Sequence, residues 1–397
     1  MDRPQESESR GGIGSAVGGG GEEGRGWKRR SMIWDRQVSF LGRVFLTVFG
    51  PKEEDPRARA VAESVEPENF PELVRASLPT KSGFKEFDYE RILKNQQEYS
   101  YTYRPGNGAS VLNAVAIFIG ASLGKFFLHV ASTTTCFDRE KLTKHLVPQP
   151  FGVRDKTRGI LTVMNHQSVI DDPLVLASFT PWWLPLRPTL ARWGTCASDI
   201  CFKGELREQY MRALKTLPVS RFIGLNQGWM DQLINYLSTG QWVNYYAEGR
   251  VSQKYIDRMR RGVGKIMCKA AENSGGLTVI PIYHEGLEDS MPLDEKNALV
   301  YKVPRVGKRL WMIAGDPIQF EDLVKKSKTC RGEECLRIYE EAADRVGVAI
   351  HLLRSDLRKR AAKEYGVYLG DPYEPYLKEK SKREEKPAES NFKFSSA

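Results

Sequence analysis

The chain has 397 residues, of which 41% are hydrophobic, so it is long enough for one large or two ordinary domains. This composition excludes both a polytopic membrane protein and a wholly disordered chain. Lys and Arg outnumber Asp and Glu by 60 to 50, and the resulting net charge of +10 favours anionic partners, either nucleic acid or an acidic membrane surface.

The first 50 residues contain two segments of different character. Residues 1–26 are rich in Gly with no apolar period, and we expect them to be disordered. Residues 27–50 predict an amphipathic basic helix, which either lies on a membrane, acts as an internal targeting element or packs as a surface helix on the domain. Its apolar positions follow helical spacing at Trp34, Val38, Leu41, Phe45 and Val48, opposite the basic stripe Arg29, Arg36 and Arg43.

The next hundred residues hold a polar stretch and then an apolar one. Residues 51–105 are charged and rich in Pro, which indicates a loosely structured connector. Residues 109–131 are the most apolar part of the chain, but the uncharged run ends before Lys125 and is short of the roughly 20 residues that a clean span needs. We therefore expect a membrane-inserted or interfacial helix here, with a buried core helix as the alternative.

Residues 136–362 alternate short apolar runs with helical patterns, and this alternation predicts an α/β domain with a mostly parallel sheet flanked by helices. The expected strands are Gly159–Met164, Leu214–Val219, Trp242–Tyr246, Leu277–Tyr283 and Leu310–Ala314. The expected helices are Leu186–Phe202 (one helix or two), 228–238, 255–273 and 333–362. The remaining segment, 365–397, indicates a charged, solvated tail with some affinity for anionic lipid.

Six cysteines do not form a disulfide scaffold in a chain of this length, and we expect all six to be reduced and structural. Four of them form two pairs of equal spacing, Cys196/Cys201 and Cys330/Cys335. A zinc site built from both pairs is a disfavoured alternative, because four intervening residues is a loose spacing for zinc ligands.

The most informative motif is the string NHQSVIDDP, residues 165–173, directly after the first predicted strand of the domain. On one regular helix His166 and Asp171 would point about 140° apart, so they can meet only where the segment bends. Pro173 suits the first turn of a following helix, with Asp172 as its N-cap. If Asp171 fixes the tautomer of His166, the other imidazole nitrogen can take a proton from a hydroxyl. The alternative is a loop histidine beside capping acids.

A second group of candidate residues follows other predicted strands. Gly249 would allow close approach of a ligand, Arg250 offers a bidentate fork for phosphate, and Glu248 could position that arginine or a substrate hydroxyl. Arg221 lies after another strand, whereas His284 favours a packed, structural histidine. Taken alone, the Glu-Gly-Arg segment could equally be a turn with a solvated arginine. The motifs of serine hydrolases, P-loop and dinucleotide-binding proteins and zinc proteases are absent.

These blocks resemble the glycerophosphate and lysophospholipid acyltransferase superfamily, with its N-H-x₄-D, arginine, E-G and V-I-P segments in the same order. Within it the chain closely resembles the tafazzin family. The resemblance covers residues 136–325 and rests on NHQSVIDDP, Ala197–Phe202, Leu217–Arg221, Gly240–Val243, Gly262–Lys265 and Ile313–Pro317. Tyr246-Ala247 and Arg250 replace the Phe-Pro and Lys that are usual around the E-G pair.

The resemblance implies a CoA-independent transacylase that exchanges acyl chains between phospholipids and lysophospholipids, with cardiolipin remodelling at mitochondrial membranes. It implies His166 and Asp171 as the catalytic dyad and Arg221, Glu248, Gly249 and Arg250 as the acceptor phosphate site, supported by Asn165 and Ser168. No cofactor and no metal are expected, because exchanging one ester for another is nearly isoenergetic. The expected partners are phospholipids and a membrane surface.

Three other functions stay open from the sequence. An acyl-CoA-dependent lysophospholipid acyltransferase would use the same dyad and phosphate grip. A non-catalytic membrane lipid-binding protein with this fold is less favoured, because the His166/Asp171 pair is intact. Nucleic-acid binding is disfavoured, because the basic residues do not cluster with aromatic residues as a groove or stacking platform requires.

Overall fold

A computed structural model describes residues 55–78, 110–146, 157–220, 224–253, 255–295, 297–373 and 376. All of these residues belong to one structural unit, residues 52–397. The expected disordered segment 1–26 and the expected amphipathic helix 27–50 lie outside the described residues. So do Arg221, residues 51–54 and 79–105 of the expected connector and most of the expected charged tail.

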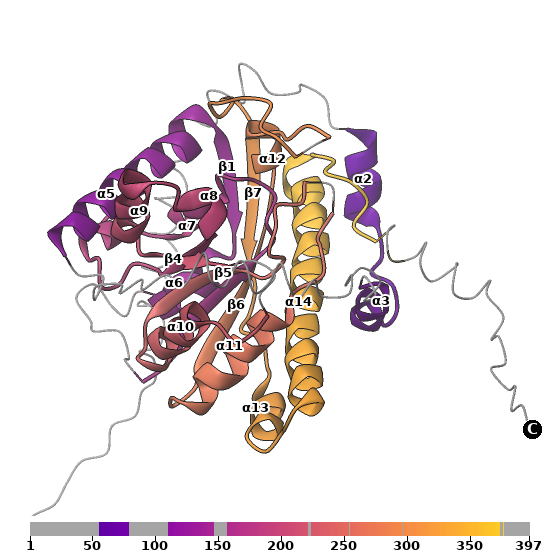
Figure 1. Cartoon of the computed structure of the whole chain (residues 1–397). Coiled ribbons are helices and arrows are strands. Elements are labelled where there is room, and N and C mark those ends of the chain that lie inside the picture. Colours follow the sequence, from indigo (N-terminus) through magenta and orange to yellow (C-terminus); the bar gives the residue numbers. More distant parts are fainter. Residues whose placement is uncertain are drawn as a thin grey trace, which may run out of the picture. The chain divides into compact units, whose positions relative to one another are not determined.

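A five-stranded sheet with the strand order β1-β7-β6-β2-β5 forms the centre of the fold (Figure 1). Its strands are β1 (Thr133–Phe137), β2 (Gly159–Met164), β5 (Trp242–Tyr246), β6 (Leu277–Glu285) and β7 (Arg309–Ala314). All neighbouring pairs are parallel except β6 and β7, which run antiparallel. The prediction of a mostly parallel sheet flanked by helices is confirmed.

A smaller parallel sheet of β3 (Gly194–Ala197) and β4 (Thr216–Val219) adjoins β5. The link is Trp193, whose N–H donates to the Trp242 carbonyl at 2.8 Å and whose carbonyl accepts from the Asn244 N–H at 2.8 Å. The prediction of helix throughout Leu186–Phe202 is therefore wrong. A strand forms in the middle of this range because its hydrogen-bond partners in β4 and β5 are distant in sequence. Helical turns occur only at its ends, in η2 (Leu184–Leu186) and α8 (Ser198–Cys201).

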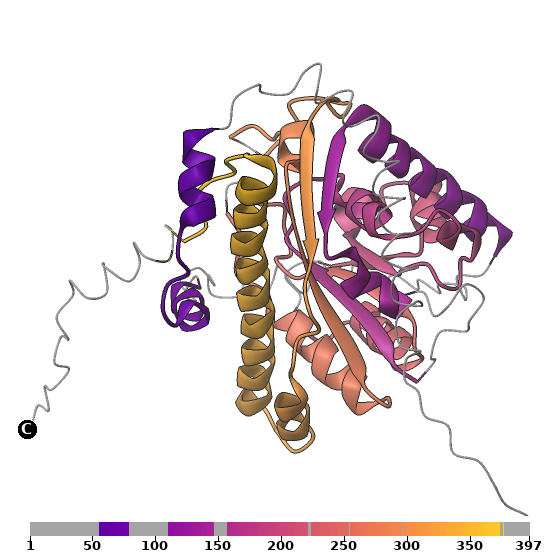
Figure 2. The same ribbon diagram turned by 180° about the vertical axis from the view of Figure 1, so that it is seen from behind.

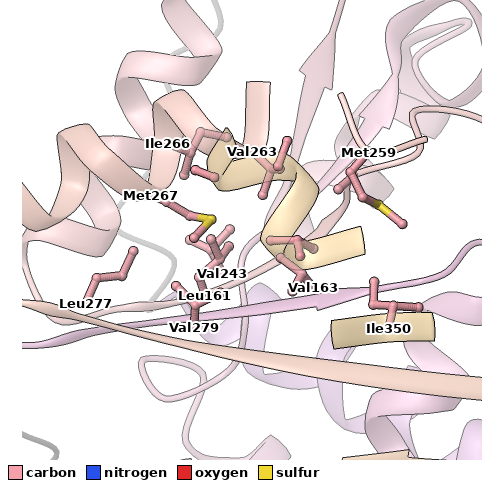
Figure 3. Packing of buried hydrophobic residues seen from close by; sticks show 14 of the residues in the cluster. Leu161, Val163, Val243, Met259, Val263, Ile266, Met267, Leu277, Val279 and Ile350 are labelled. Carbon is pink, nitrogen blue, oxygen red and sulfur yellow. The ribbon is translucent and has the colours of Figure 1, made fainter. Parts of the chain in front are cut away.

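Side chains alternate along β2 and feed two separate cores. Leu161 and Val163 join the core with α10 (Gly228–Ser238), α11 (Arg261–Glu272), α13 (Glu321–Ser327) and α14 (Glu333–Tyr365). Figure 3 shows these two residues beside Val263, Ile266 and Met267 of α11. Ile160 and Met164 join the second core, which contains α6 (Arg139–Leu146) and α7 (Asp171–Phe179). Buried strands with helices on both faces account for the continuous apolar runs in the sequence.

The apolar stretch after residue 109 forms α5 (Val111–Phe126), which continues into η1 (Phe127–Ala131). Within the described ranges it is the one helix long and apolar enough to cross a membrane. Polar anchors nevertheless fix it to the domain at both ends. Asn113 donates to the Ala213 carbonyl at the end of α9 (Glu205–Ala213), at 2.9 Å. The buried Lys125 ammonium donates to the Ala177 carbonyl of α7 at 2.6 Å.

Part of the expected connector is ordered rather than loose. Residues 55–78 contain α2 (Pro56–Glu63) and α3 (Phe70–Ser77), and both pack along α14 (Figures 1 and 2). The side chain of Asp55 accepts from the Arg57 N–H at 2.9 Å and caps α2, whose first residue is a proline. Phe70 packs edge-on against the rings of Tyr373 and Tyr376. These helices bring the segment before α5 against the segment after α14.

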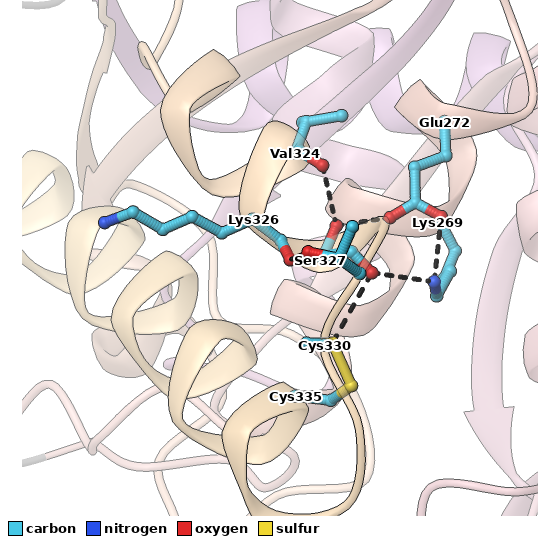
Figure 4. Close-up of a disulfide and its surroundings, with 8 residues drawn as sticks. Lys269, Glu272, Val324, Lys326, Ser327, Cys330 and Cys335 are labelled. Atoms are coloured by element: carbon cyan, nitrogen blue, oxygen red, sulfur yellow. Dashed lines mark hydrogen bonds and ion pairs between the residues drawn. A yellow bond between two sulfur atoms is a disulfide. The ribbon is translucent and has the colours of Figure 1, made fainter.

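Four cysteines are paired, so the prediction that all six are reduced is wrong for them. Disulfides join Cys196 to Cys201 and Cys330 to Cys335, while Cys136 and Cys268 are thiols outside any disulfide. The first pair spans the step from β3 into α8, and the second closes the turn between α13 and α14 (Figure 4). Each turn brings its own two cysteines together, and therefore the two pairs do not combine into the zinc site considered above.

Candidate active site

Three parallel strands end together at one edge of the sheet and carry the predicted motifs. The register pairs Met164, at the end of β2, with Tyr246 of β5 and with Ile282 of β6. The loop after β2 contains His166, the loop after β5 contains Glu248, and β6 continues into His284. Carboxyl ends of parallel strands are where ligand sites form in α/β sheets.

His166 and Asp171 are in contact, with 2.9 Å between Nδ1 and Oδ2. A tight turn, closed by the Asp171 N–H on the Ser168 carbonyl at 3.2 Å, provides the bend that this five-residue spacing requires. The same carboxylate oxygen accepts the backbone N–H groups of Gln167, at 2.8 Å, and Ser168, at 2.9 Å. The fully buried Asp171 carboxylate is thus fixed by three donors and can orient the imidazole.

Asp172 does not cap the following helix as we expected. Its peptide bond to Pro173 is cis, its backbone is extended, and no side-chain cap bond is made at this end of α7. The carboxylate instead pairs with Arg192, whose Nε donates to it at 2.8 Å. This ion pair joins the start of α7 to the segment that leads into β3.

The backbone and ring of His166 are held on further sides. The Tyr246 ring stacks on the imidazole, with 4.2 Å between centroids. The Ser252 N–H donates to the His166 carbonyl at 2.7 Å, and the His166 N–H donates to Glu248 Oε1 at 2.7 Å. Because Nδ1 faces Asp171, Nε2 is the nitrogen that can serve as a base toward a substrate, and 22% of the side chain is exposed.

Glu248, which we expected to position Arg250 or a substrate hydroxyl, lies inside the protein. It is fully buried, and its second oxygen accepts the Asp257 N–H at 2.7 Å. Burial raises the pKa of the Glu248 carboxyl to about 8, against the opposing effect of its two backbone hydrogen bonds. Glu248 therefore joins the loop after β2 to Asp257, in the segment that leads into α11.

Gly249 and Arg250 follow Glu248 and lie at the surface of the protein. Gly249 has a φ of 72°, in the region that only glycine adopts readily. The Arg250 side chain is 54% exposed, and its guanidinium is held by Asp257 at 2.6 Å and by the Tyr255 hydroxyl at 3.1 Å. An exposed guanidinium with a fixed orientation is well suited to bind a phosphate. The other predicted arginine, Arg221, lies outside the described residues.

The predicted supporting residues are buried behind the dyad. Asn165 donates to the His284 carbonyl at 2.9 Å and accepts the His284 N–H at 3.0 Å, which ties the ends of β2 and β6 together. The His284 ring is fully buried, and its Nε2 lies 3.6 Å from Asp171 Oδ2. Burial lowers the pKa of the His284 imidazole, and the prediction of a packed histidine is confirmed. Ser168 is buried as well and contributes its backbone to the turn.

Several residues of the site were not found from the sequence. Gln253 donates to the carbonyls of Gln167, at 3.1 Å, and Met291, at 2.9 Å, and it accepts the Leu293 N–H at 2.8 Å. It thereby fastens the residue after His166 to the segment beyond α12 (Leu287–Ser290). These contacts join parts of the chain that are far apart in sequence, and no local motif marks them. Tyr246 and Asp257 stand inside or near the quoted E-G block, but only the fold reveals their partners.

The protein also has an apolar pocket that is open to the solvent. This pocket lies between α5 and α7, and its lining includes Pro173, which follows Asp171 by two residues in the sequence. Its lining includes Ile117, Gly120 and Ala121 of α5, Leu176 and Ala177 of α7, and Trp242 of β5. A lining of this kind suits an apolar group.

Comparisons with known proteins agree with this arrangement. The acyltransferase family model matches residues 139–285, which contain His166, Asp171, Arg221, Glu248, Gly249 and Arg250. The chain is 32% identical to the tafazzin of Dictyostelium discoideum over 210 residues, which cover 51% of this chain and 68% of that one. It is 29% identical to the tafazzin of Drosophila melanogaster over 54% of this chain and 52% of the relative. It is also 29% identical to the N-acylphosphatidylethanolamine synthase of Arabidopsis thaliana, over 53% and 70% respectively.

Proposed function

The chain belongs to the tafazzin family of acyltransferases, and on that premise we propose that it is a phospholipid–lysophospholipid transacylase that needs no CoA. Its substrates in this proposal are cardiolipin and related phospholipids of mitochondrial membranes. The observation that carries the proposal is the contact between His166 and the buried Asp171 at the edge of the sheet. A histidine oriented in this way is the general base that acyl transfer to a hydroxyl requires.

In the proposed reaction, Nε2 of His166 takes the proton from a lysophospholipid hydroxyl as that oxygen attacks the ester carbon of a donor phospholipid. Asp171 stabilises the imidazolium that forms. When the tetrahedral intermediate collapses, the ester bond of the donor breaks and the departing oxygen takes the proton back from His166. The acceptor is now acylated and the donor has become a lysophospholipid. One ester has replaced another, so the reaction requires no metal or nucleotide.

Two further features would hold the lipids. We assign Arg250, with Arg221, to the phosphate of the acyl acceptor, and the exposed, oriented guanidinium of Arg250 supports this. We assign the pocket between α5 and α7 to an acyl chain, and its apolar lining, which includes Pro173 of the segment after Asp171, supports that. Glu248, Asn165 and Ser168 are positioning residues in this proposal, because their contacts are made within the protein.

The same proposal places α5 in the membrane interface rather than across the bilayer. One side of the helix is anchored by Asn113 and Lys125, and its other side exposes large apolar residues. These are Val111, Leu112, Val115, Phe118, Ile119, Leu123 and Phe126. A helix that packs on its own domain along one side and is apolar on the other suits a protein bound from one membrane face.

Two alternative reactions use the same base. In the first, acyl-CoA is the donor, because the dyad and the phosphate grip do not depend on the leaving group. In the second, the amine of phosphatidylethanolamine is the acyl acceptor, and the similarity to the N-acylphosphatidylethanolamine synthase favours testing it. The donor and the acceptor therefore have to be varied separately.

The test uses the purified full chain in vesicles that contain cardiolipin, with a labelled lysophospholipid, with and without acyl-CoA. Matched vesicles with labelled phosphatidylethanolamine and no lysophospholipid test N-acylation. We expect transfer to the lysophospholipid without CoA, reduced by about 10²–10⁴ in His166→Ala. His351→Ala is the control, because His351 lies on α14 and bonds the Tyr376 hydroxyl. Transfer only with acyl-CoA, or only to the amine, would replace our proposal by the corresponding alternative.

A further inference from the structure

The segment between α12 and β7 exposes apolar side chains on the surface of the domain. We call residues 298–309 the basic loop. Its exposed apolar residues are Leu299 (48% exposed), Val300 (51%), Tyr301 (43%), Val303 (72%) and Val306 (65%). A soluble surface rarely gathers so many large apolar side chains without a partner that covers them.

The positive charge of this segment favours an anionic partner. Between Ala298 and Gly315 the sequence has four basic residues and no Asp or Glu. The four are Lys302, Arg305, Lys308 and Arg309. The Arg305 guanidinium lies over the Tyr301 ring, 5.4 Å from its centroid. Aromatic and basic side chains among aliphatic ones are typical of segments that bind anionic lipid at a membrane interface.

The basic loop is tied to its surroundings and continues the apolar side of α5. The Arg305 N–H donates to the Ser290 carbonyl at 2.9 Å, and the Gly307 N–H donates to the Ala131 carbonyl at 2.7 Å. The second bond places the loop at the end of η1, beside the exposed Val130 (59% exposed). Figures 1 and 2 both show this loop next to the end of α5 that leads into β1. The two apolar surfaces are therefore neighbours and can meet one bilayer.

We propose that the basic loop is a second membrane-binding element, which inserts its aliphatic side chains into an anionic phospholipid bilayer beside α5. The proposal rests on the proposed function in that the substrates are membrane lipids. It also relates membrane contact to the active site. Gln253 bonds both the carbonyl after His166, on Gln167, and the backbone of Met291 and Leu293, from which the segment runs to the basic loop. Binding at the loop would hold the mouth of the site at the lipid surface.

The test measures binding of the full chain to vesicles by flotation. Vesicles of phosphatidylcholine alone are compared with vesicles of phosphatidylcholine mixed with phosphatidylglycerol, which is anionic but is not cardiolipin. We expect the double variant Val303→Glu/Val306→Glu to bind the anionic vesicles at least roughly tenfold more weakly. We expect Lys302→Glu to weaken binding to the anionic vesicles alone. Val65→Glu is the matched control, because Val65 is 85% exposed in the connection between α2 and α3.

Unchanged binding of the double variant, with an unchanged thermal unfolding curve, would overturn the proposal. The proposal would also be overturned if the double variant had half the molecular mass of the unchanged protein in solution. The loop would then be an interface between two copies of the chain. Activity is measured in parallel on short-chain lipids dispersed below their micelle concentration. Retained activity there with loss on vesicles supports the proposal. Flotation measures binding and needs no turnover. A chain that binds vesicles through the loop but transfers no acyl group would therefore contradict the proposed function and leave the membrane-binding proposal intact.

Discussion

The carboxyl group of Glu248 accepts the backbone N–H of His166, with 2.7 Å between Oε1 and N, although the two residues are 82 positions apart. Its other oxygen accepts the N–H of Asp257, which in turn holds Arg250. One buried side chain thus connects the loop of the candidate base to the loop of the candidate phosphate ligand. Disturbing it should affect the geometry of both.

The buried position of Glu248 predicts that stability depends on pH. The pKa of this carboxyl is about 8 in the folded protein and near 4.5 when the chain is unfolded. The folded state keeps a proton that the unfolded state releases, so the free energy of unfolding falls as the pH rises between these values. The slope is at most about 1.4 kcal/mol per pH unit. Urea unfolding over this pH range, followed by circular dichroism, measures it.

Glu248→Gln is the matched variant, because glutamine does not ionise. It loses one of the two acceptor bonds, which lowers the unfolding free energy by about 1–3 kcal/mol, and it removes the contribution of this residue to the slope. Burial also raises the pKa of Glu288, to about 7, but this residue is common to both proteins and cancels in their difference. Equal slopes in the two proteins would show that residue 248 does not titrate in this range.

Arg250 predicts an effect on the affinity for the acyl acceptor. If the guanidinium grips a phosphate away from the reacting ester, Arg250→Ala should raise KM for the lysophospholipid by roughly 10–100-fold with little change in kcat. The KM of Arg250→Lys should lie between those of the unchanged protein and Arg250→Ala, because lysine keeps the charge but lacks the bidentate fork. Arg337→Ala, an exposed arginine of α14 paired with Glu333, is the control. A fall in kcat with KM unchanged would contradict a binding role.

The extent to which the sequence predicts this fold differs between elements for physical reasons. The runs at Gly159–Met164 and Trp242–Tyr246 have the predicted bounds, because buried parallel strands are uniformly apolar and are bounded by turn residues. The strand Gly194–Ala197 was missed because it has four residues and all its partners are remote. For α2 a local signal was present, since Asp55 followed by Pro56 is a helix start, but the surrounding charges suggested a loose segment.

Some parts of the candidate site can likewise be predicted from the sequence, and others cannot. The dyad is predictable because the six residues 166–171 contain both partners, and a helix begins directly at their end. The internal position of Glu248 is not predictable, because both of its hydrogen bonds are to backbone groups and backbone groups leave no sequence signal. The disulfides follow from turns that bring cysteines with 6.1 Å and 5.2 Å between Cα atoms together, which spacing alone does not reveal.

The cysteine pairing predicts the number of reactive thiols. Alkylation of the unfolded protein without reductant should modify two of the six cysteines, Cys136 and Cys268, whereas alkylation after reduction should modify all six. Intact mass and peptide mapping give the count. Opening the short loop between Cys330 and Cys335 should lower the unfolding free energy by about 2 kcal/mol. Six modified cysteines without reductant would show that the chain is reduced in solution.

Gly120 predicts the acyl-chain preference, because it lines the pocket between α5 and α7. A Cβ placed there has Leu214 Cδ2 at 3.7 Å as its nearest neighbour, which is an ordinary contact, and we expect the rest of a leucine side chain in Gly120→Leu to extend into the pocket. Folding should be unimpaired, since leucine is favoured over glycine in a helix by up to about 1 kcal/mol. Transfer of long chains relative to short ones should fall by roughly tenfold or more. Val115→Leu, on the exposed side of α5, is the control. An unchanged chain-length profile with a stable fold would mean that the acyl chain lies elsewhere.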